Sequence, residues 1–193
     1  MKALKRVMAG EYSRELGTKV LAGQKQLAEL GFKQGGPPGY GFGRMLVGPD
    51  RSPKQILSHG ERKSIATDRV ILVPGPAHEI ERVREIYRMF TAEKMSFKAI
   101  ARELNRRGIP SARDAQWTHS IVATILSHPR YVGCLVFNQT SRRLGARWLA
   151  RPRTDWMIGS GAQQAIVDPQ SFALAQEIIA SRTARKRISV YPG

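Results

Sequence analysis

Residues 96–133 constrain the fold most, because they carry two apolar patterns separated by residues that end helices. In the first pattern, apolar side chains recur at helical spacing and would line one face: Phe97, Ile100, Ala101 and Leu104. Ser96 can cap the start of this helix, since its hydroxyl can accept from an unpaired backbone N–H group. Gly108 followed by Pro110 ends the helix.

A second, shorter helix is predicted from Thr118 to Ser127. Thr118 is a candidate N-terminal cap, and Pro129 forces the chain out of the helix. The inner stripe of this helix would consist of Ile121, Val122, Ile125 and Leu126. The two helices predict a helix-turn-helix variant, whose connecting segment is longer than the tight turn of the simplest versions.

The outer face of the second helix carries side chains that suit the DNA major groove. They are small, polar, and neutral or weakly basic, and we expect base contacts from His119, Ser120, Ala123 and Thr124. Arginines around this helix would contact phosphates: Arg102, Arg106, Arg107 and Arg113. The alternative is a helical hairpin inside an ordinary core, with the arginines on a solvated face.

The charge balance favours a polyanionic partner. The chain has 32 Lys and Arg against 15 Asp and Glu, and its sequence pI is near 10.9. Such a balance is typical of proteins that bind nucleic acid or an anionic membrane. No apolar run approaches the length of a membrane span, and no charged-then-apolar signal opens the chain. Double-stranded DNA is therefore the expected partner, and a membrane is not.

Cysteine and histidine usage indicates a reducing compartment and no metal site or cofactor. Cys134 is the only cysteine, which excludes an internal disulfide and a cysteine–histidine ligand set for structural zinc. The histidines are scattered without metal-ligand spacing: His59, His78, His119 and His128. We therefore expect a cytoplasmic protein without a cofactor.

Residues 1–30 predict a long basic helix whose apolar positions are too irregular for a strict coiled coil. Because such a helix does not bury its own apolar side chains, we expect it to pack on a partner or on another copy of itself. Residues 31–48 are rich in glycine and proline, which rules out a regular helix. We interpret them as an extended arm along a DNA groove, with Lys33 and Arg44 on phosphates; a flexible linker is the alternative.

The remaining segments predict an α+β class: a mostly helical DNA-binding domain with a small β-sheet. Strands are expected at residues 69–74, 131–138, 156–158 and 165–167. Scaffold helices are expected at residues 76–94 and 169–181. Residues 141–153 contain five arginines and no acidic residue, and we expect Arg142 and Arg143 to contact the DNA backbone. Residues 186–193 are expected to form a basic, frayed tail.

The order and spacing of these motifs resemble the recombinase domain of large serine recombinases, a family that includes phage integrases and transposon resolvases. The resemblance covers most of residues 10–185. It includes GFKQGGPPGYGF after the basic helix, the helix AHEIERVREIYRMF, and the closing segment DWMIGSGAQQAIVDPQSFALAQEII. Its most specific part runs from Ile100 and Leu104 through Gly108-Ile-Pro110, Trp117 and Ile125-Leu126 to Tyr131-Val-Gly133.

The resemblance implies a division of labour. In the family, a catalytic domain supplies a serine nucleophile and arginines that attack DNA phosphates, while the recombinase domain grips the attachment or recombination site. On this interpretation, residues 1–30 are the connecting helix from a catalytic domain outside this chain and residues 31–48 are a groove linker. Residues 49–185 are then the recombinase domain, and residues 186–193 are the tail. No catalytic residue is assigned here, and a homodimer or tetramer would form through the catalytic domain.

Two other classes of function remain as alternatives. One is a basic regulatory or protein-interaction module that binds a partner through residues 1–30, without a specific DNA site. The other is an enzyme in its own right, such as a nuclease. The sequence lacks a tight cluster of carboxylates or histidines for metal-assisted hydrolysis, which disfavours the second alternative.

Overall fold

The computed structural model describes residues 2–141, 147, 149–159 and 163–190, which form α-helices and small antiparallel sheets. The helices are α1 (Lys2–Glu29), α2 (Ala77–Thr91), α3 (Phe97–Arg106), α4 (His119–Ser127) and α5 (Pro169–Val190), with short 3-10 helices at Ala112–Asp114, Pro129–Val132 and Arg153–Asp155. The strands are β1 (Phe42–Val47), β2 (Pro53–Leu57), β3 (Arg69–Pro74), β4 (Leu135–Phe137), β5 (Thr140–Ser141), β6 (Leu149–Ala150) and β7 (Met157–Gly159). The predicted α+β class, with its long first helix, is confirmed.

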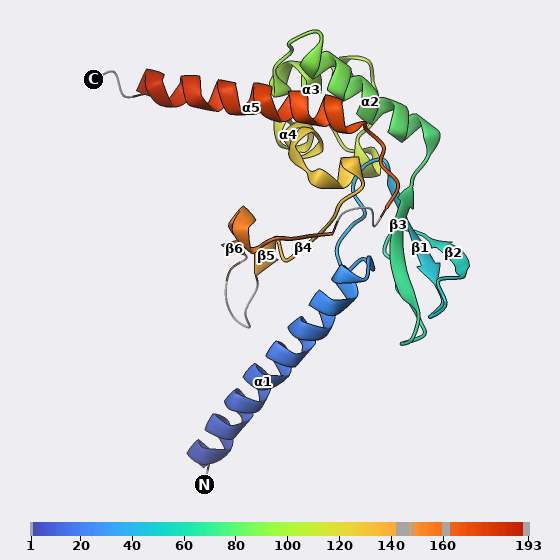
Figure 1. Cartoon of the computed structure of the whole chain (residues 1–193), viewed down its shortest axis with the longest axis vertical. Helices are drawn as coiled ribbons and strands as arrows, with labels where there is room; N and C mark the ends of the chain where they lie inside the picture. Colours follow the sequence, from blue (N-terminus) through green and yellow to red (C-terminus); the bar gives the residue numbers. More distant parts are fainter. Residues whose placement is uncertain (1, 142–146, 148, 160–162, 191–193) are drawn as a thin grey trace.

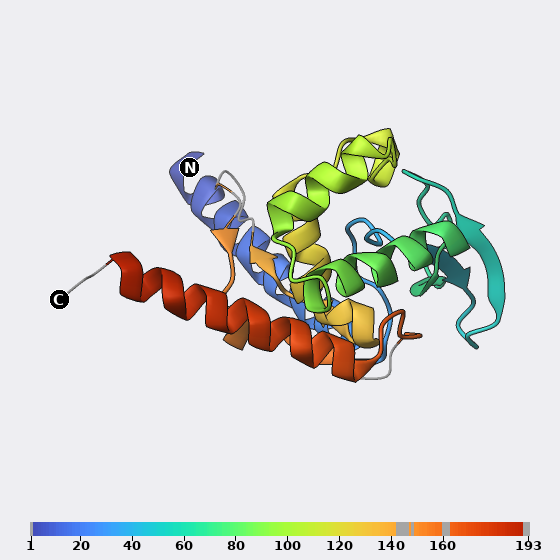
Figure 2. The ribbon, with the colours of Figure 1, turned by 90° about the horizontal axis from the view of Figure 1, so that it is seen from above.

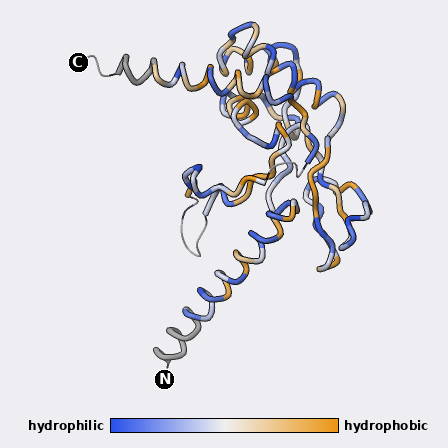
Figure 3. Tube along the Cα trace, in the orientation of Figure 1, coloured by the Kyte–Doolittle hydropathy of each residue, from blue (hydrophilic) through white to orange (hydrophobic). Residues whose placement is uncertain are grey.

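Helix α1 extends away from the rest of the molecule (Figure 1). Polar and apolar residues are interleaved along it (Figure 3). Residues 10–20 are exposed, including the apolar side chains of Tyr12, Leu16 and Val20. The C-terminal end of the helix contacts β4 and β7, and Ala28 is buried there. The expected packing of α1 on a partner or on another copy stays a prediction.

The C-terminal end of α1 is fixed by a glycine-dependent turn and by one arginine. Gly31 has a φ of 86°, and the N–H group of Phe32 donates to the carbonyl of Leu27 at 2.9 Å. This pattern is a common way to end a helix, because glycine adopts positive φ without strain. The Arg51 guanidinium donates to the carbonyl of Leu30 at 2.7 Å and lies 5.0 Å from the centre of the Phe32 ring. We call this group of contacts the α1 joint.

The larger sheet has the strand order β2-β1-β3, with both pairs antiparallel. An ion pair links its two outer strands, because Lys54 lies in β2 and Asp68 directly precedes β3. The two charged groups are 2.7 Å apart, and the Asp68 carboxylate is almost completely buried. The strand predicted at residues 69–74 is confirmed as β3. Strand β2 is not evident from sequence, because its residues are polar and mostly exposed, as expected for an edge strand.

Residues 31–48 are part of the folded body, which differs from the flexible linker that the sequence left open, and their expected contact with a DNA groove stays a prediction. Residues 42–47 form the central strand of the larger sheet. Upstream of them, the N–H group of Lys33 donates to the carbonyl of Val70 at 2.7 Å. The aromatic rings of Phe32, Tyr40 and Phe42 are buried rather than presented to solvent. These rings fix the segment to the body, because each buries a large apolar area.

The helical part of the molecule forms the main core. Helix α5 runs alongside α2 and α4, and α3 packs on α4. Figure 2 shows the larger sheet at one end of this group of helices. The apolar faces of these helices meet in one cluster, in which Val83, Ile86, Phe90, Ile100 and Leu104 are fully buried. Burial of this apolar surface is the main term that holds the helices together.

Three elements differ from the sequence expectation. The strand expected at residues 131–138 begins only at Leu135, because Pro129–Val132 form a 3-10 helix and Gly133 turns the chain with a φ of 87°. Residues 165–167 are not a strand; the N–H groups of Ile166 and Val167 both donate to the carbonyl of Tyr131. Helix α5 continues to Val190, whereas the sequence predicted an end at residue 181 and a frayed tail from 186. Residues 182–190 contain few helix breakers, which accounts for the extension.

Candidate nucleic-acid interface

The two helices of the predicted helix-turn-helix variant, α3 and α4, pack against each other and are capped as the sequence predicted. The Ser96 hydroxyl accepts a hydrogen bond from the N–H group of Ala99 at 3.2 Å. The Thr118 hydroxyl accepts from the N–H group of Ile121 at 3.3 Å. Each cap satisfies a backbone donor that has no partner inside its helix, and so fixes where the helix begins.

The long connection between α3 and α4 is held by specific contacts. The side-chain amide of Asn105 donates to the carbonyl of Trp117 at 3.0 Å and accepts from the Trp117 N–H group at 2.8 Å. The indole N–H of Trp117 donates to the carbonyl of Ile109 at 3.0 Å, and its ring is buried against Tyr40. These contacts pin both ends of the connection. They position α4 relative to α3 in place of the tight turn found in simpler motifs.

The outer face of α4 brings the four expected base-contact residues together. His119, Ser120 and Thr124 are exposed, and Ala123 is half-buried. The Thr124 hydroxyl donates to the carbonyl of Ser120 at 2.8 Å, and the Ser120 hydroxyl lies 3.3 Å from Nε2 of His119. Each hydroxyl keeps acceptor capacity for a base amino group, and the methyl groups can contact the methyl group of thymine. Base contact by these residues stays a prediction.

A buried histidine supports the end of α4. The ring of His128 is 7% exposed, and its Nδ1 accepts from the N–H group of Arg130 at 3.1 Å. The amide of Gln139 lies 2.7 Å from Nε2. Burial is the main cause that lowers the pKa of His128 to about 4, and the charge of the neighbouring Arg130 is the second. The ring is therefore neutral near pH 7 and acts as a hydrogen-bonding support.

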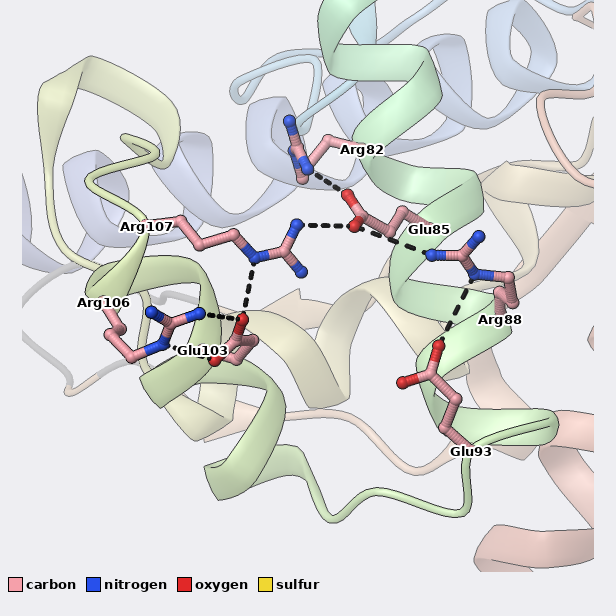
Figure 4. A network of polar contacts seen from close by, with 7 residues as sticks. All are labelled: Arg82, Glu85, Arg88, Glu93, Glu103, Arg106 and Arg107. Carbon is pink, nitrogen blue, oxygen red and sulfur yellow. Dashed lines mark hydrogen bonds and ion pairs between the residues drawn. The ribbon is translucent and has the colours of Figure 1, made fainter.

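The expected phosphate contacts on α3 have different surroundings. Arg102 is exposed. Arg106 is exposed as well, but its guanidinium forms two hydrogen bonds with the Glu103 carboxylate, each at 2.8 Å (Figure 4). The hydrogen bonds from Arg106, together with that from Arg107, lower the pKa of Glu103 to about 2. Arg106 therefore has an internal partner that a DNA phosphate would have to replace.

Arg107 links two helices. Its guanidinium lies 2.8 Å from the Glu85 carboxylate on α2 and 3.0 Å from that of Glu103 on α3 (Figure 4). Burial would raise the pKa of Glu85, but the hydrogen bond from Arg107 and the charge of Arg82 outweigh it, so this pKa lies below its usual range. The geometry gives Arg107 a supporting position, and its expected contact with phosphate stays a prediction.

Lys33 and Arg44 lie on the side of the molecule that includes the larger sheet. The Lys33 ammonium donates to the carbonyl of Gly35, and the Arg44 guanidinium donates to the carbonyl of Ser58. Burial is the main cause that lowers the pKa of Lys33 to about 8, and the positive charges of Arg130 and Arg44 contribute to the same shift. Lys33 and Arg44, both expected to contact phosphate, therefore lie close to each other and to a third cation, Arg130.

Two of the expected residues, Arg142 and Arg143, lie outside the described residues, as does the side chain of Arg113. The structure adds an arginine that the sequence did not single out by itself. The Arg153 guanidinium is 3.4 Å from the carbonyl of Ser127, at the C-terminal end of α4, and 5.4 Å from the centre of the Trp156 ring. A cation is favourable there, because the C-terminal end of a helix is electronegative. In the sequence, only the high arginine content of residues 141–153 indicated that Arg153 could contact DNA.

The described part of the chain has neither a membrane-spanning helix nor a group of metal ligands. Within residues 2–141, 147, 149–159 and 163–190, no helix combines the length and apolar character that crossing a bilayer requires. Across the same residues, His, Cys, Asp and Glu side chains do not gather in groups of three or more that could hold a metal ion. The expected absence of a cofactor therefore stays a prediction.

Comparison with solved structures shows the fold. One chain in a crystal structure of an LSR–DNA complex is 16% identical to this chain, with a TM-score of 0.50 over 84% of this chain. The match covers 39% of that chain, so the present sequence corresponds to well under half of its length. A second structure, from work on the sequence requirements of the Listeria innocua prophage attP site, is 17% identical, with a TM-score of 0.37, over 64% of this chain and 43% of that one.

Comparison with protein families shows the relationship in sequence. No curated protein matches the chain significantly. The model of the Recombinase family, in contrast, matches residues 77–182. This range contains α2, α3, α4 and most of α5, together with the buried histidine and the capped helix pair described above. The match covers more than half of the 193 residues, and the chain therefore belongs to the Recombinase family.

Proposed function

We propose that this chain binds double-stranded DNA sequence-specifically at an attachment or recombination site, as the DNA-gripping part of a site-specific serine recombinase that integrates, excises or inverts DNA. The observation that carries the proposal is the outer face of α4. Its hydrogen-bonding side chains, His119, Ser120 and Thr124, are exposed on a helix whose position is fixed on three sides. The net charge of +17 and membership of the Recombinase family support it.

In this proposal, α4 enters the major groove and its outer face contacts base edges, while cations on neighbouring elements contact phosphates. Arg102 is the best-placed phosphate contact on α3, because it is exposed and has no ion-pair partner among the described residues. A second candidate phosphate contact is Arg153, whose guanidinium lies beside the C-terminal end of α4. Phosphate contacts set the position of the protein on the duplex, and base contacts distinguish one sequence from another.

The test begins with identification of the site. The purified chain is used to recover bound fragments of genomic DNA, and the enriched sequence is compared with a shuffled duplex of equal length and composition by fluorescence anisotropy. We expect the enriched duplex to bind at least about tenfold more tightly, since a single good base contact contributes about 1–3 kcal/mol of discrimination. Equal affinity for both duplexes at every salt concentration would contradict the proposal.

We also propose that this chain binds DNA without cleaving it and that strand exchange needs a catalytic domain, through which a dimer or tetramer would form. Serine-mediated cleavage requires an activated hydroxyl and cations arranged around the reacting phosphate. The assay is incubation with supercoiled plasmid that carries the identified site, with and without magnesium, followed by a detergent quench. We expect unchanged plasmid. A nicked or protein-linked product that one serine substitution abolishes would contradict this part of the proposal.

A second candidate function is a protein-interaction module, which the exposed apolar side chains of α1 favour. Tyr12, Leu16 and Val20 recur every four residues and so lie along one line of the helix. Substitution of all three by Gln separates the two candidates. Sequence-specific DNA binding through α4 should survive this change in the isolated chain, whereas binding to a protein partner through α1 should not.

A further inference from the structure

A cleft of about 700 Å³ lies between residues 31–41, which we call the glycine-rich segment, and the larger sheet. Cations from separate parts of the chain line it, and we call the site the basic cleft: Lys33, Arg44, Arg62, Lys63 and Arg69. Two acidic residues, Glu61 and Asp68, also line it. Five cations therefore meet two carboxylates in one concave surface.

The two carboxylates leave the cleft positive, because Asp68 is paired with a lysine outside it and Glu61 is a single negative charge against five cations. The Asp68 carboxylate is 2% exposed and forms its ion pair with Lys54, which is not among the residues that line the cleft. The Glu61 carboxylate accepts from the N–H group of Ser58 at 2.8 Å and from the Gln55 amide at 2.7 Å. Both carboxylates therefore stabilise β2 and the loop that follows this strand.

The cations of the cleft donate to neutral groups. Arg44 donates to the carbonyl of Ser58, and Lys63 donates to the carbonyls of Ala66 and Asp68 at 2.8 Å and 2.9 Å. Arg69 donates to backbone carbonyls of residues 66–68. A carbonyl orients a cation without cancelling its charge. Arg62 has neither a hydrogen-bond nor an ion-pair partner in the described residues, and its guanidinium is exposed.

The cations also disfavour one another. Burial and the charges of Arg130 and Arg44 make it harder to keep Lys33 protonated, as the lowered pKa given above shows. The guanidinium of Arg130 is itself largely buried, and it donates to the carbonyl of Pro38 in the glycine-rich segment. A bound anion would remove this mutual repulsion, whereas water removes it only in part.

The basic cleft adjoins the end of α4. Arg130 belongs to the 3-10 helix that directly follows α4, and its side chain bonds to both the His128 ring and the glycine-rich segment. A polyanion held on the outer face of α4 could therefore continue past Arg130 towards Lys33. An extended duplex satisfies this arrangement better than a single small anion, because only an extended polyanion can contact the outer face of α4 and the cations of the basic cleft together.

We propose that the basic cleft binds phosphate groups of the DNA backbone and forms a second contact with the duplex, beyond the reach of α4. This inference rests on the proposed function. The contribution of the basic cleft to DNA affinity does not depend on the base sequence, because phosphates are the same in every duplex. The glycine-rich segment thus acts in DNA binding as one fixed wall of a charged cleft, rather than as an arm inserted into a groove.

The test uses single substitutions that remove one charge each. Arg62→Gln removes a side chain without an internal partner, and Arg44→Gln removes the cation that adjoins Lys33. Lys94→Gln is the matched control, because exposed Lys94 follows the end of α2 that lies far from the sheet. Affinity for the identified site and for a shuffled duplex is measured from low to high salt, and inorganic pyrophosphate is added in a thermal-shift experiment.

We expect each cleft variant to bind both duplexes several-fold more weakly, with the log–log salt slope reduced by about one, and Lys94→Gln to match the wild type. Cleft variants that match Lys94→Gln would overturn the inference and leave the proposed function standing. Stabilisation by pyrophosphate that Arg62→Gln abolishes, with unchanged duplex binding, would overturn it in favour of a small-anion site. Failure of the wild-type chain to bind any duplex would overturn the proposed function and the inference together.

Discussion

The hydroxyl of Tyr131 donates a hydrogen bond to the backbone carbonyl of Tyr40 across 3.1 Å, between groups that are 91 positions apart in the chain. Tyr131 follows α4 directly, and Tyr40 belongs to the glycine-rich segment. The bond therefore joins the helix that we propose to read DNA bases to one wall of the basic cleft. Burial raises the pKa of the Tyr131 hydroxyl well above its usual range, so the group remains a donor at any physiological pH.

Substitution Tyr131→Phe should destabilise the protein. It removes the donor and leaves the carbonyl of Tyr40 without this partner in a buried position, which costs about 1 kcal/mol. We expect this loss in the free energy of unfolding, measured by urea denaturation. Tyr12→Phe is the control, since the Tyr12 side chain is exposed on α1. A Tyr131→Phe variant as stable as the control would mean that the bond contributes nothing to joining the two parts.

Substitutions on the outer face of α4 should lower specificity. We expect His119→Ala and Thr124→Ala to weaken binding to the identified site about tenfold or more and to change binding to shuffled duplex little, since base contacts carry the discrimination. Arg102→Ala should weaken both duplexes by a similar factor, because a phosphate contact is blind to sequence. Fluorescence anisotropy at one fixed salt concentration measures all three. If Thr124→Ala weakened binding to both duplexes equally, this result would contradict base contact by α4 and would leave the helix with a structural role only.

Substitution Glu103→Gln should strengthen binding to DNA of any sequence. Glu103 holds the guanidinium of Arg106 in two hydrogen bonds, and a neutral amide would release much of that cation for a phosphate. We expect several-fold tighter binding to shuffled duplex and a salt slope that is steeper by up to about one. Stability should change little, because the pair with Arg106 is exposed and such pairs contribute little, and because Arg107, the other partner of Glu103, keeps its ion pair with Glu85.

The control for this experiment is Glu93→Gln, which breaks the exposed pair with Arg88 on α2 (Figure 4). It removes the same negative charge from the chain without touching α3. If both variants bind shuffled duplex equally well, the effect comes from net charge alone, and Arg106 lies away from the DNA.

The stability of the protein should depend on pH through His128. Its pKa in the folded protein is about 4, below the ordinary value of 6.5, so the unfolded chain binds more protons between these pH values. The free energy of unfolding should therefore rise as the pH increases from 4 to 6.5, and this contribution should be constant above 6.5. The charged groups that face the ring are Arg130, Arg153 and Lys33, all cationic.

Urea denaturation at a series of pH values between 4.5 and 7.5 measures this contribution. His128→Gln keeps a hydrogen-bonding side chain without a titrating group, and we expect it to flatten the pH dependence. His78→Gln, at an exposed position at the start of α2, should leave the slope unchanged. An identical slope in wild type and His128→Gln would contradict the assignment of a neutral, buried ring.

Local patterns were sufficient to predict the helices and their caps. The spacing of Ile100 and Leu104 and the hydroxyl groups of Ser96 and Thr118 act within one or two turns of helix, so neighbouring residues determine the outcome. The exposure of His119 and Thr124 follows from the same periodicity. The edge strand β2 lacked such a pattern, because its side chains face solvent and its position depends on pairing with β1.

Long-range contacts decided the features that the sequence could not predict. The glycine-rich segment is fixed by Tyr131 and Arg130, which lie about ninety positions away in the chain. Similarly, nothing near Arg107 in the sequence shows that Glu85, 22 positions upstream, is its partner. Composition identifies a basic protein, but only the fold separates cations held by carboxylates from cations that donate to carbonyls.

The contacts of the α1 joint determine the position of a helix end that lies far from them. Helix α1 has 28 residues and is therefore about 40 Å long, whereas its attachment consists of contacts around Ala28, Phe32 and Arg51. A slight rotation at this end becomes a displacement of many ångströms at the other. The direction in which α1 points is thus set by a small group of contacts: those of Ala28 with β4 and β7, the turn at Gly31, and the Arg51 guanidinium on a carbonyl and an aromatic ring.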